Sequence, residues 1–216
     1  VLDLCWGSAT ACGAEIFKAT GADVTVINGE PNGKKINVNC GSTDLGLLRT
    51  AVLQEGADMG FAFDGDADRM IAVDSTGRVI DGDHTLYLWG KTLKNRGELP
   101  ENRLVGTIMS NLGFEREWQK QGGHFERTPV GDQHVHAAML KSGARLGGEQ
   151  SGHILSAKHG FHGDGVLTAL QIATICQSRG KTLENFRDES FTPFPQKLIN
   201  IPFANKELSN NWKDCQ

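Results

Sequence analysis

The strongest constraint on the fold is an alternation of short apolar runs with helix-length amphipathic stretches, which the chain repeats twice. In the first half the apolar runs are 1–5, 22–27 and 58–63, and the amphipathic stretches are 10–20 and 43–55. This alternation is typical of α/β proteins, in which strands and helices follow one another along the chain. The sequence therefore predicts the α/β class.

A predicted hairpin and a predicted helix complete the first unit. Two apolar runs, 69–74 and 78–81, flank the turn sequence Ser75-Thr76-Gly77, and 82–93 has the pattern of a closing helix. The polar segment 94–102 contains Gly and Pro, so we interpret it as a linker.

The same order returns after the linker. Strands are expected at 104–109, 124–130, 144–148 and 153–156, and helices at 112–121, 133–141 and 165–177. We therefore expect two structurally similar units, at 1–97 and 102–190. A Pro-rich break and an apolar run at 198–203 predict that 191–216 is a linker and the start of a truncated further domain.

Composition excludes several functional classes. The net charge of -4 in 216 residues makes nucleic acid an unexpected partner, and no apolar run is long enough to predict a membrane span. Five scattered cysteines without a C-x-x-C pair argue against a disulfide framework or a structural zinc site. We expect a cytoplasmic protein. The start inside an apolar strand is what we expect of a piece of a longer protein.

The run Asp64-Gly65-Asp66-Ala67-Asp68-Arg69 follows an apolar strand and predicts a metal site. On extended backbone Asp64, Asp66 and Asp68 point to one side, and carboxylate oxygens favour Mg²⁺, Ca²⁺ or Mn²⁺. Arg69 would offer its guanidinium to an anion such as phosphate. An EF-hand is excluded because its glycine and glutamate positions are occupied here by Arg69 and Ser75. A solvated acidic turn without metal stays open.

A second polar cluster, Gly147 to His153, follows the predicted strand 144–148. On extended backbone Glu149, Ser151 and His153 share one face, and their hydrogen-bonding groups suit sugar hydroxyls. A glycine-rich β-turn with incidental polar residues is the alternative.

The remaining histidines have simpler explanations. His134 and His136 are two apart on a predicted helix, so they point to different faces and are expected to be surface or packing residues. His159 and His162 lie in a glycine-rich loop, and Asp164 is expected to cap the helix that follows. No glycine-rich nucleotide-binding loop is present in the sequence.

Together the two clusters resemble a family, the α-D-phosphohexomutases. The acidic run resembles the family's metal-binding loop, and Gly148 to His153 resembles its sugar-binding loop, in the same order. Segments 37–43, 107–113 and 130–132 are similar as well. Gln150, where the phosphomannomutase branch typically has Met, resembles the branch that acts on glucosamine phosphates. The resemblance implies two similar three-layer α/β domains with mixed sheets, the second and third of four.

The resemblance also implies a reaction. A phosphoserine gives its phosphoryl group to a sugar 6-phosphate, and a bisphosphorylated intermediate turns over before the enzyme takes a phosphoryl group back. Mg²⁺ on the three aspartates and Arg69 would assist the transfer, and His153 would support the sugar or shuttle a proton. The implied substrate-binding residues for a hexosamine phosphate are Glu149, Gln150, Ser151 and Asp132.

The chain departs from the family in ways that matter for activity. It has neither a phosphoserine segment nor the phosphate-binding loop of the family's fourth domain, so we expect the fragment alone to be inactive. Gln133 follows Asp132 where the branch often has Arg or Lys, which weakens the expected contact there. A hexose-phosphate mutase and a non-catalytic metal- or sugar-phosphate-binding module are the alternatives.

Overall fold

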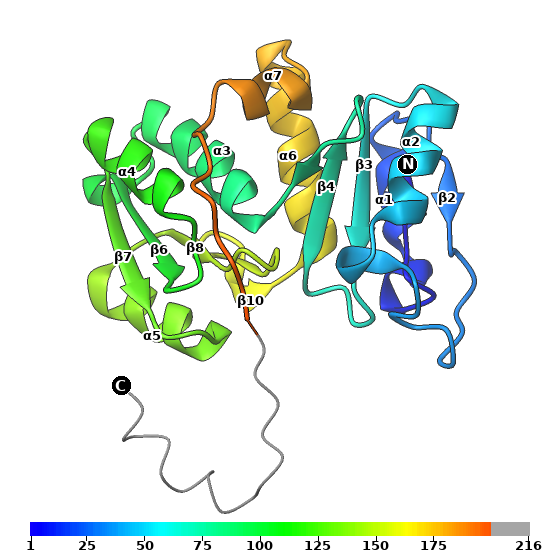
Figure 1. Cartoon of the computed structure of the whole chain (residues 1–216), viewed down its shortest axis with the longest axis horizontal. Helices are drawn as coiled ribbons and strands as arrows, with labels where there is room; N and C mark the ends of the chain where they lie inside the picture. The colour runs from blue at the N-terminus through cyan, green and yellow to red at the C-terminus, as the bar shows by residue number, and fades with distance from the viewer. Residues whose placement is uncertain (200–216) are drawn as a thin grey trace, which may run out of the picture.

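Two five-stranded mixed sheets organise the structure (Figure 1), a computed structural model that describes residues 1–199. The first sheet has the order β2-β1-β3-β4-β5, with β1 at Leu2–Asp3, β2 at Val26–Ile27, β3 at Met59–Phe63, β4 at Met70–Asp74 and β5 at Val79–Ile80. The second has the order β10-β9-β8-β6-β7, with β6 at Arg103–Thr107, β7 at His124–Thr128, β8 at Leu146–Gly148, β9 at Ile154–Ser156 and β10 at Gly160–Gly163.

The two sheets have one topology. In each, the first three strands in chain order are mutually parallel, and the last two pair antiparallel in a meander. If β1 to β5 are replaced in turn by β6 to β10, the first order becomes β7-β6-β8-β9-β10, which is the second order read from its other edge. The predicted α/β class, the mixed sheets and the similarity of the halves are therefore confirmed.

Helices cover both faces of each sheet. They are α1 at Gly13–Ala19, α2 at Gly46–Glu55, α3 at Gly82–Asn95, α4 at Leu112–Lys120, α5 at Asp132–Ser142, α6 at Gly165–Arg179 and α7 at Leu183–Asp188. On β3, Ala62 packs with α2, whereas the neighbouring Phe61 belongs to the core that α1 and α6 share. Successive strand residues point to opposite faces, so this strand is buried on both sides and the unit has three layers.

One apolar core runs through both halves. It joins Phe61 of the first sheet to Leu104 and Leu146 of the second, with Leu86 of α3 and Ile172 of α6 between them. The helix α3 was expected to close the first unit, but it packs on β8 of the second sheet and against α6. In turn α6 packs on β4 and β3 of the first sheet. The halves therefore exchange helices, which differs from the predicted division at 97–102.

Local predictions fared better than this long-range one. The hairpin at 75–77 is confirmed, since Ala72 pairs with Ile80 across it and Gly77 has φ +81°. The segment around His162, expected to be a loop, is the edge strand β10. The strand expected at 198–203 lies largely outside the described residues, so it stays a prediction.

Asp74 closes that hairpin from inside the protein. Its fully buried carboxylate accepts hydrogen bonds from the amides of Thr76 (3.0 Å) and Arg78 (2.9 Å), the Thr76 hydroxyl (2.7 Å) and Arg78 Nε (2.8 Å). Burial by itself raises the pKa of Asp74, but these hydrogen bonds outweigh burial and hold the pKa below its usual value.

We expect Asp74→Ala to lower the free energy of unfolding by about 1 to 3 kcal/mol, because buried donors lose their acceptor. Urea denaturation measures this loss, and Asp23→Ala, which removes an exposed carboxylate, is the control. Since the folded pKa is lowered, the contribution is present above about pH 4 and is lost as pH falls through the folded value. Equal stability of the two variants would contradict the role of Asp74.

Candidate active site

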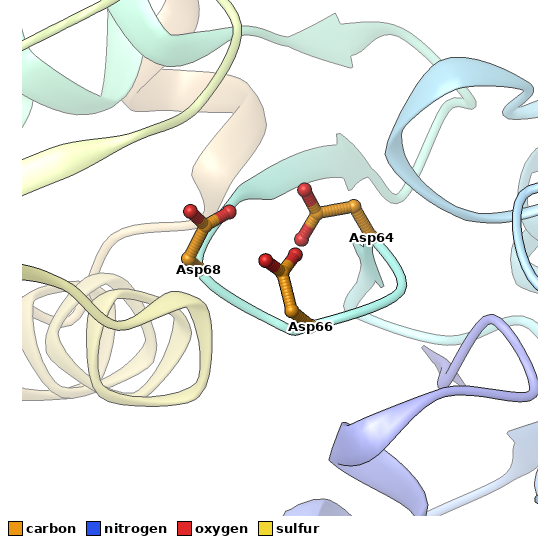
Figure 2. Close-up of side chains that lie close together, drawn as sticks. All are labelled: Asp64, Asp66 and Asp68. Carbon is orange, nitrogen blue, oxygen red and sulfur yellow. The ribbon is translucent and has the colours of Figure 1, made fainter. Parts of the chain in front are cut away.

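Three aspartates converge in the turn between β3 and β4. Asp64, Asp66 and Asp68 each offer a carboxylate oxygen, and these oxygens lie within 4.8 Å of one another (Figure 2). Asp64 is buried with 7% of its surface exposed, Asp66 is exposed, and Asp68 is intermediate. The predicted clustering of the three carboxylates is present in the structure.

The backbone of this turn is tighter than the predicted extended loop. Ala67 has φ +62° and its amide donates to the Asp64 carbonyl oxygen (3.2 Å). Two neighbouring segments hold the turn: the amide of Gly165, at the start of α6, donates to the Ala67 oxygen (2.8 Å), and that of Ser8 donates to the Gly65 oxygen (2.9 Å). The carboxylates therefore converge because the chain folds back, not because alternate residues share a face.

The carboxylates are under electrostatic strain. Burial raises the pKa of Asp64 to about 6, and the charges of Asp68 and Asp66 add to the rise. Arg69 opposes it, because its amide donates to Asp64 Oδ1 (3.2 Å). The Arg69 Nε lies 3.7 Å from Asp64 Oδ2 and 3.8 Å from Asp68 Oδ1. A cation bound between the carboxylates would relieve their repulsion more fully.

The donor set fits a hard divalent cation. All three groups supply oxygen, which Mg²⁺, Mn²⁺ and Ca²⁺ prefer, and Asp68 Oδ1 is buried without a hydrogen-bond partner among the described residues. Two Mg²⁺–O bonds in line span about 4.2 Å. The carboxylate oxygens, which lie within 4.8 Å of one another, would thus need to move only slightly closer together to bind one Mg²⁺. The terminal nitrogens of Arg69 make no hydrogen bond or ion pair to residues 1–199, which leaves them available to a ligand.

The second cluster forms the turn of the β8–β9 hairpin. Glu149 donates its amide to the His153 oxygen (2.9 Å), Gly152 donates to the Glu149 oxygen (3.0 Å), and Gly152 has φ +94°. The expected extended backbone is wrong here. Ser151 is exposed whereas His153 is only 6% exposed, so Glu149, Ser151 and His153 do not share one face.

The neighbouring loop orients Glu149. The amide of Gly131 donates to Glu149 Oε1 (3.0 Å), which leaves the other oxygen for a ligand. The carboxylate of Asp132 accepts from the Gln133 amide (2.7 Å) at the start of α5. Thus the 130–132 segment reaches Glu149 through its backbone. Gln150 instead lines a surface cavity with Asp81, Asn111 and Phe194.

Direct contacts join the aspartate turn to the β8–β9 turn. His153 Nδ1 lies 3.2 Å from Asp68 Oδ2, residues 69 and 153 form a β-bridge, and the Met70 amide donates to the Gly152 oxygen (3.1 Å). A Cβ at Gly152 would collide with the Met70 carbonyl oxygen, and one at Gly163 would collide with the His153 ring. The glycines therefore allow the two turns to form one site.

The helix α3 also contributes to this site, which its sequence pattern did not predict. Gly82, the first residue of α3, donates its amide to the Gln150 oxygen (3.0 Å), and a Cβ there would collide with the Glu149 oxygen. A glycine just inside a helix was the available signal. His134 and His136 agree with their interpretation as surface or packing residues, since His134 is exposed and the ring of His136 packs 5.2 Å from Phe161.

Two family models match the chain, and together they cover most of it. Residues 1–77 match phosphoglucomutase/phosphomannomutase alpha/beta/alpha domain II, and residues 81–194 match alpha/beta/alpha domain III. The chain belongs to the phosphoglucomutase/phosphomannomutase family. The aspartate turn thus lies in domain II and the β8–β9 turn in domain III, as the resemblance implied. The domain III match includes α3, in agreement with its packing on β8.

Curated members of this family resemble the chain along its whole length. It is 64% identical to a phosphoglucosamine mutase of Synechococcus sp. (strain CC9311) and 65% identical to one of Prochlorococcus marinus (strain MIT 9313). Each alignment covers 100% of this chain but 47% and 46% of the relative, respectively. The chain therefore spans about half the length of the curated relatives it matches.

Solved structures of the family share the fold. A Burkholderia thailandensis phosphoglucomutase/phosphomannomutase family protein superposes with a TM-score of 0.77 at 23% identity, covering 91% of this chain and 42% of that one. Aspergillus fumigatus N-acetylphosphoglucosamine mutase, in complex with GlcNAc-6P and magnesium, superposes with a TM-score of 0.75 at 20% identity, covering 96% of this chain and 48% of that one.

Among the described residues, no helix combines the length and the apolar character needed to cross a membrane.

The raised pKa of Asp64 makes metal-free stability depend on pH. Because the folded pKa (about 6) exceeds the usual value (about 3.9), the folded state binds the proton more tightly. As pH rises from about 4 to about 6, we expect the free energy of unfolding of the metal-free protein to fall by up to about 3 kcal/mol, at 1.36 kcal/mol per pKa unit. Asp64→Asn should remove this loss.

Thermal unfolding with and without Mg²⁺ checks this expectation. Stabilisation by Mg²⁺ should grow as pH rises through about 6, because protons and metal compete for Asp64. Asp23→Asn, an exposed carboxylate, should behave as the unsubstituted protein. A Mg²⁺ effect that is constant between pH 5 and 8 would contradict metal binding at Asp64.

Proposed function

We propose that the full-length protein is a phosphoglucosamine mutase, which interconverts glucosamine 6-phosphate and glucosamine 1-phosphate. The observation that carries this proposal is the contact between the aspartate turn and the β8–β9 turn, which has hydrogen-bonding groups that suit a sugar. The chain is also 64% identical to a phosphoglucosamine mutase over its whole length. The reaction would proceed through a phosphoserine enzyme and a bisphosphorylated sugar.

The aspartate turn would be the phosphoryl-transfer centre. Asp64, Asp66 and Asp68 would hold Mg²⁺, which supplies neutralising charge to a phosphoryl group in transfer. Arg69 would bind phosphate oxygens through its terminal nitrogens, while its Nε stays beside Asp64 and Asp68. Transfers of this type depend on positioning and electrostatics, and the tight turn supplies both.

The β8–β9 turn would hold the sugar. Glu149, fixed through one oxygen by the Gly131 amide, would accept a hydrogen bond from a sugar hydroxyl with the other. The exposed Ser151 can donate and accept, and Asp132, next to Gly131, would complete the contacts. Gln150 would contact the substrate from the neighbouring surface cavity that it lines. The substrate would therefore sit beside the metal rather than over the sheet.

His153 would act mainly as a positioning residue. Its ring is buried and its Nδ1 lies 3.2 Å from Asp68 Oδ2, so it can orient that carboxylate toward the metal. Proton transfer to the sugar would need an open path to its Nε2, which is buried and lacks a partner among residues 1–199. We therefore favour support of Asp68 over the proton shuttle.

The rest of the reaction needs parts of the polypeptide beyond this chain. The relatives are about twice as long, and we propose that their additional domains supply the phosphoserine and the loop that binds the non-reacting phosphate. The fragment alone would bind metal and sugar phosphate without turnover. We also propose a cytoplasmic location, with neither nucleic acid nor a membrane as partner.

A hexose-phosphate mutase is the second candidate, because the matched family is described by phosphoglucomutase and phosphomannomutase. Competition in a coupled assay of the full-length protein separates the two. We expect kcat/KM for glucosamine 6-phosphate to exceed that for glucose or mannose 6-phosphate by at least about 10-fold, equivalent to 1.4 kcal/mol in the transition state. Equal or better turnover of a hexose phosphate would refute the glucosamine assignment.

Replacing Asp66 tests the metal centre. In the full-length enzyme Asp66→Ala should lower kcat by about 100-fold or more, because the metal loses a carboxylate ligand on which charge neutralisation depends. Mg²⁺ titration should show weakened affinity, whereas Asp23→Ala, which removes another exposed carboxylate, should change neither quantity. Near-normal activity of the Asp66 variant in saturating Mg²⁺ would show that Asp66 is not a ligand.

A further inference from the structure

Two buried cysteines face one another beneath the aspartate turn. Cys5 follows β1 and Cys40 precedes the short helical turn Gly41–Thr43, yet their Sγ atoms are only 3.8 Å apart. Both side chains are fully buried. By contrast, Cys12 is exposed and Cys176 is buried, and neither has a thiol neighbour among the described residues. The pair is therefore a distinct feature of this part of the fold.

Backbone contacts hold the two cysteines in place. Asp3, which is fully buried at the end of β1, accepts hydrogen bonds from the amides of Cys5 (3.0 Å) and Gly41 (2.8 Å). Its carboxylate thus links Cys5 to Gly41, the residue that follows Cys40. Cys5 and Trp6 also have φ +54° and +56°, a conformation that few non-glycine residues adopt and that the surroundings must maintain.

The segment that carries Cys40 forms a wall of the aspartate turn. A Cβ at Gly65 would collide with Ile36, and a Cβ at Gly41 would collide with both Cys5 Sγ and the Phe63 carbonyl oxygen. The amide of Asn37 donates to Cys5 Sγ (3.3 Å). Ile36 and Gly41 therefore contact the residues on both sides of Asp64, and Asn37 and Gly41 contact the thiol of Cys5.

We propose that Cys5 and Cys40 form a reversible disulfide that fastens this wall to β1. The sulfur atoms would move from 3.8 Å to about 2.05 Å, a change of less than 2 Å between groups already in contact. In the reaction with a small-molecule disulfide such as oxidised glutathione, two thiols lose two protons and two electrons. The S–S bond of the oxidant breaks, and two molecules of reduced thiol leave.

The resting state of the pair is the dithiol. Burial raises the pKa of Cys5 to about 12, and its contact with Cys40 adds to the rise, so the Cys5 thiolate needed for exchange is scarce at neutral pH. Much of the covering segment, including Lys34, Lys35 and Val38, is exposed at the surface. The proposal agrees with the sequence, which argues against a permanent disulfide framework. In reducing compartments the disulfides that do occur are usually transient.

Peptide mapping of the full-length protein tests the proposal. After incubation with oxidised glutathione and digestion without reduction, we expect a cross-linked peptide that contains Cys5 and Cys40, 2 Da lighter than its two components together, which dithiothreitol releases. The oxidised protein should unfold at a temperature about 5 °C or more above that of the reduced protein. Amide exchange in residues 36–40 should slow as well.

Matched variants assign these effects to the pair. Cys5→Ser and Cys40→Ser should each abolish the cross-linked peptide and the oxidation-dependent thermal shift, whereas Cys12→Ser should retain both. Absence of the Cys5–Cys40 peptide at saturating oxidised glutathione would overturn the proposal, and this test needs no variant to fold. A thermal shift that persists in a folded Cys40→Ser variant would overturn it too.

Discussion

The rest of the structure depends on the exchange of two helices across one apolar core. The helix α3 leaves the first sheet to pack on β8, and α6 returns from the second sheet to pack on β3 and β4. Because these helices also pack against each other, the carboxyl ends of β3 and β8 are held beside one another. In open α/β sheets ligands bind at such strand ends, and here the turns that follow two of them are in direct contact.

The backbones of the aspartate turn and the β8–β9 turn approach closely, which brings their side chains together. The aspartate turn and the β8–β9 turn share a β-bridge, and a side chain at Gly152 would collide with the Met70 carbonyl oxygen across the junction. Side chains at Gly82 of α3 and Gly163 of β10 would collide with Glu149 and His153 of the β8–β9 turn. The two turns thus position one another. His153 completes the junction by placing an imidazole against the carboxylate of Asp68.

Local chemistry was predictable from the sequence, and packing between distant segments was not. The hairpin at 75–77, the cap at Asp164 and the grouping of Asp64, Asp66 and Asp68 depend on residues within a few positions of one another. The placement of α3 depends on which sheet offers the better apolar surface, which periodicity does not reveal. The face of His153 was mispredicted because Gly152, with φ +94°, reverses the backbone and breaks the alternation of an extended strand.

The helix exchange also has a consequence for biosynthesis. While the ribosome has released only the first sheet, the face of β3 that carries Phe61 lacks the cover that α6 provides, because α6 ends at Arg179. Until nearly all of the described chain has emerged, the first half can cover that face only with α1, whose Phe17 packs on Phe61. Folding of the two halves is therefore coupled, and an apolar face stays open to chaperones during that interval.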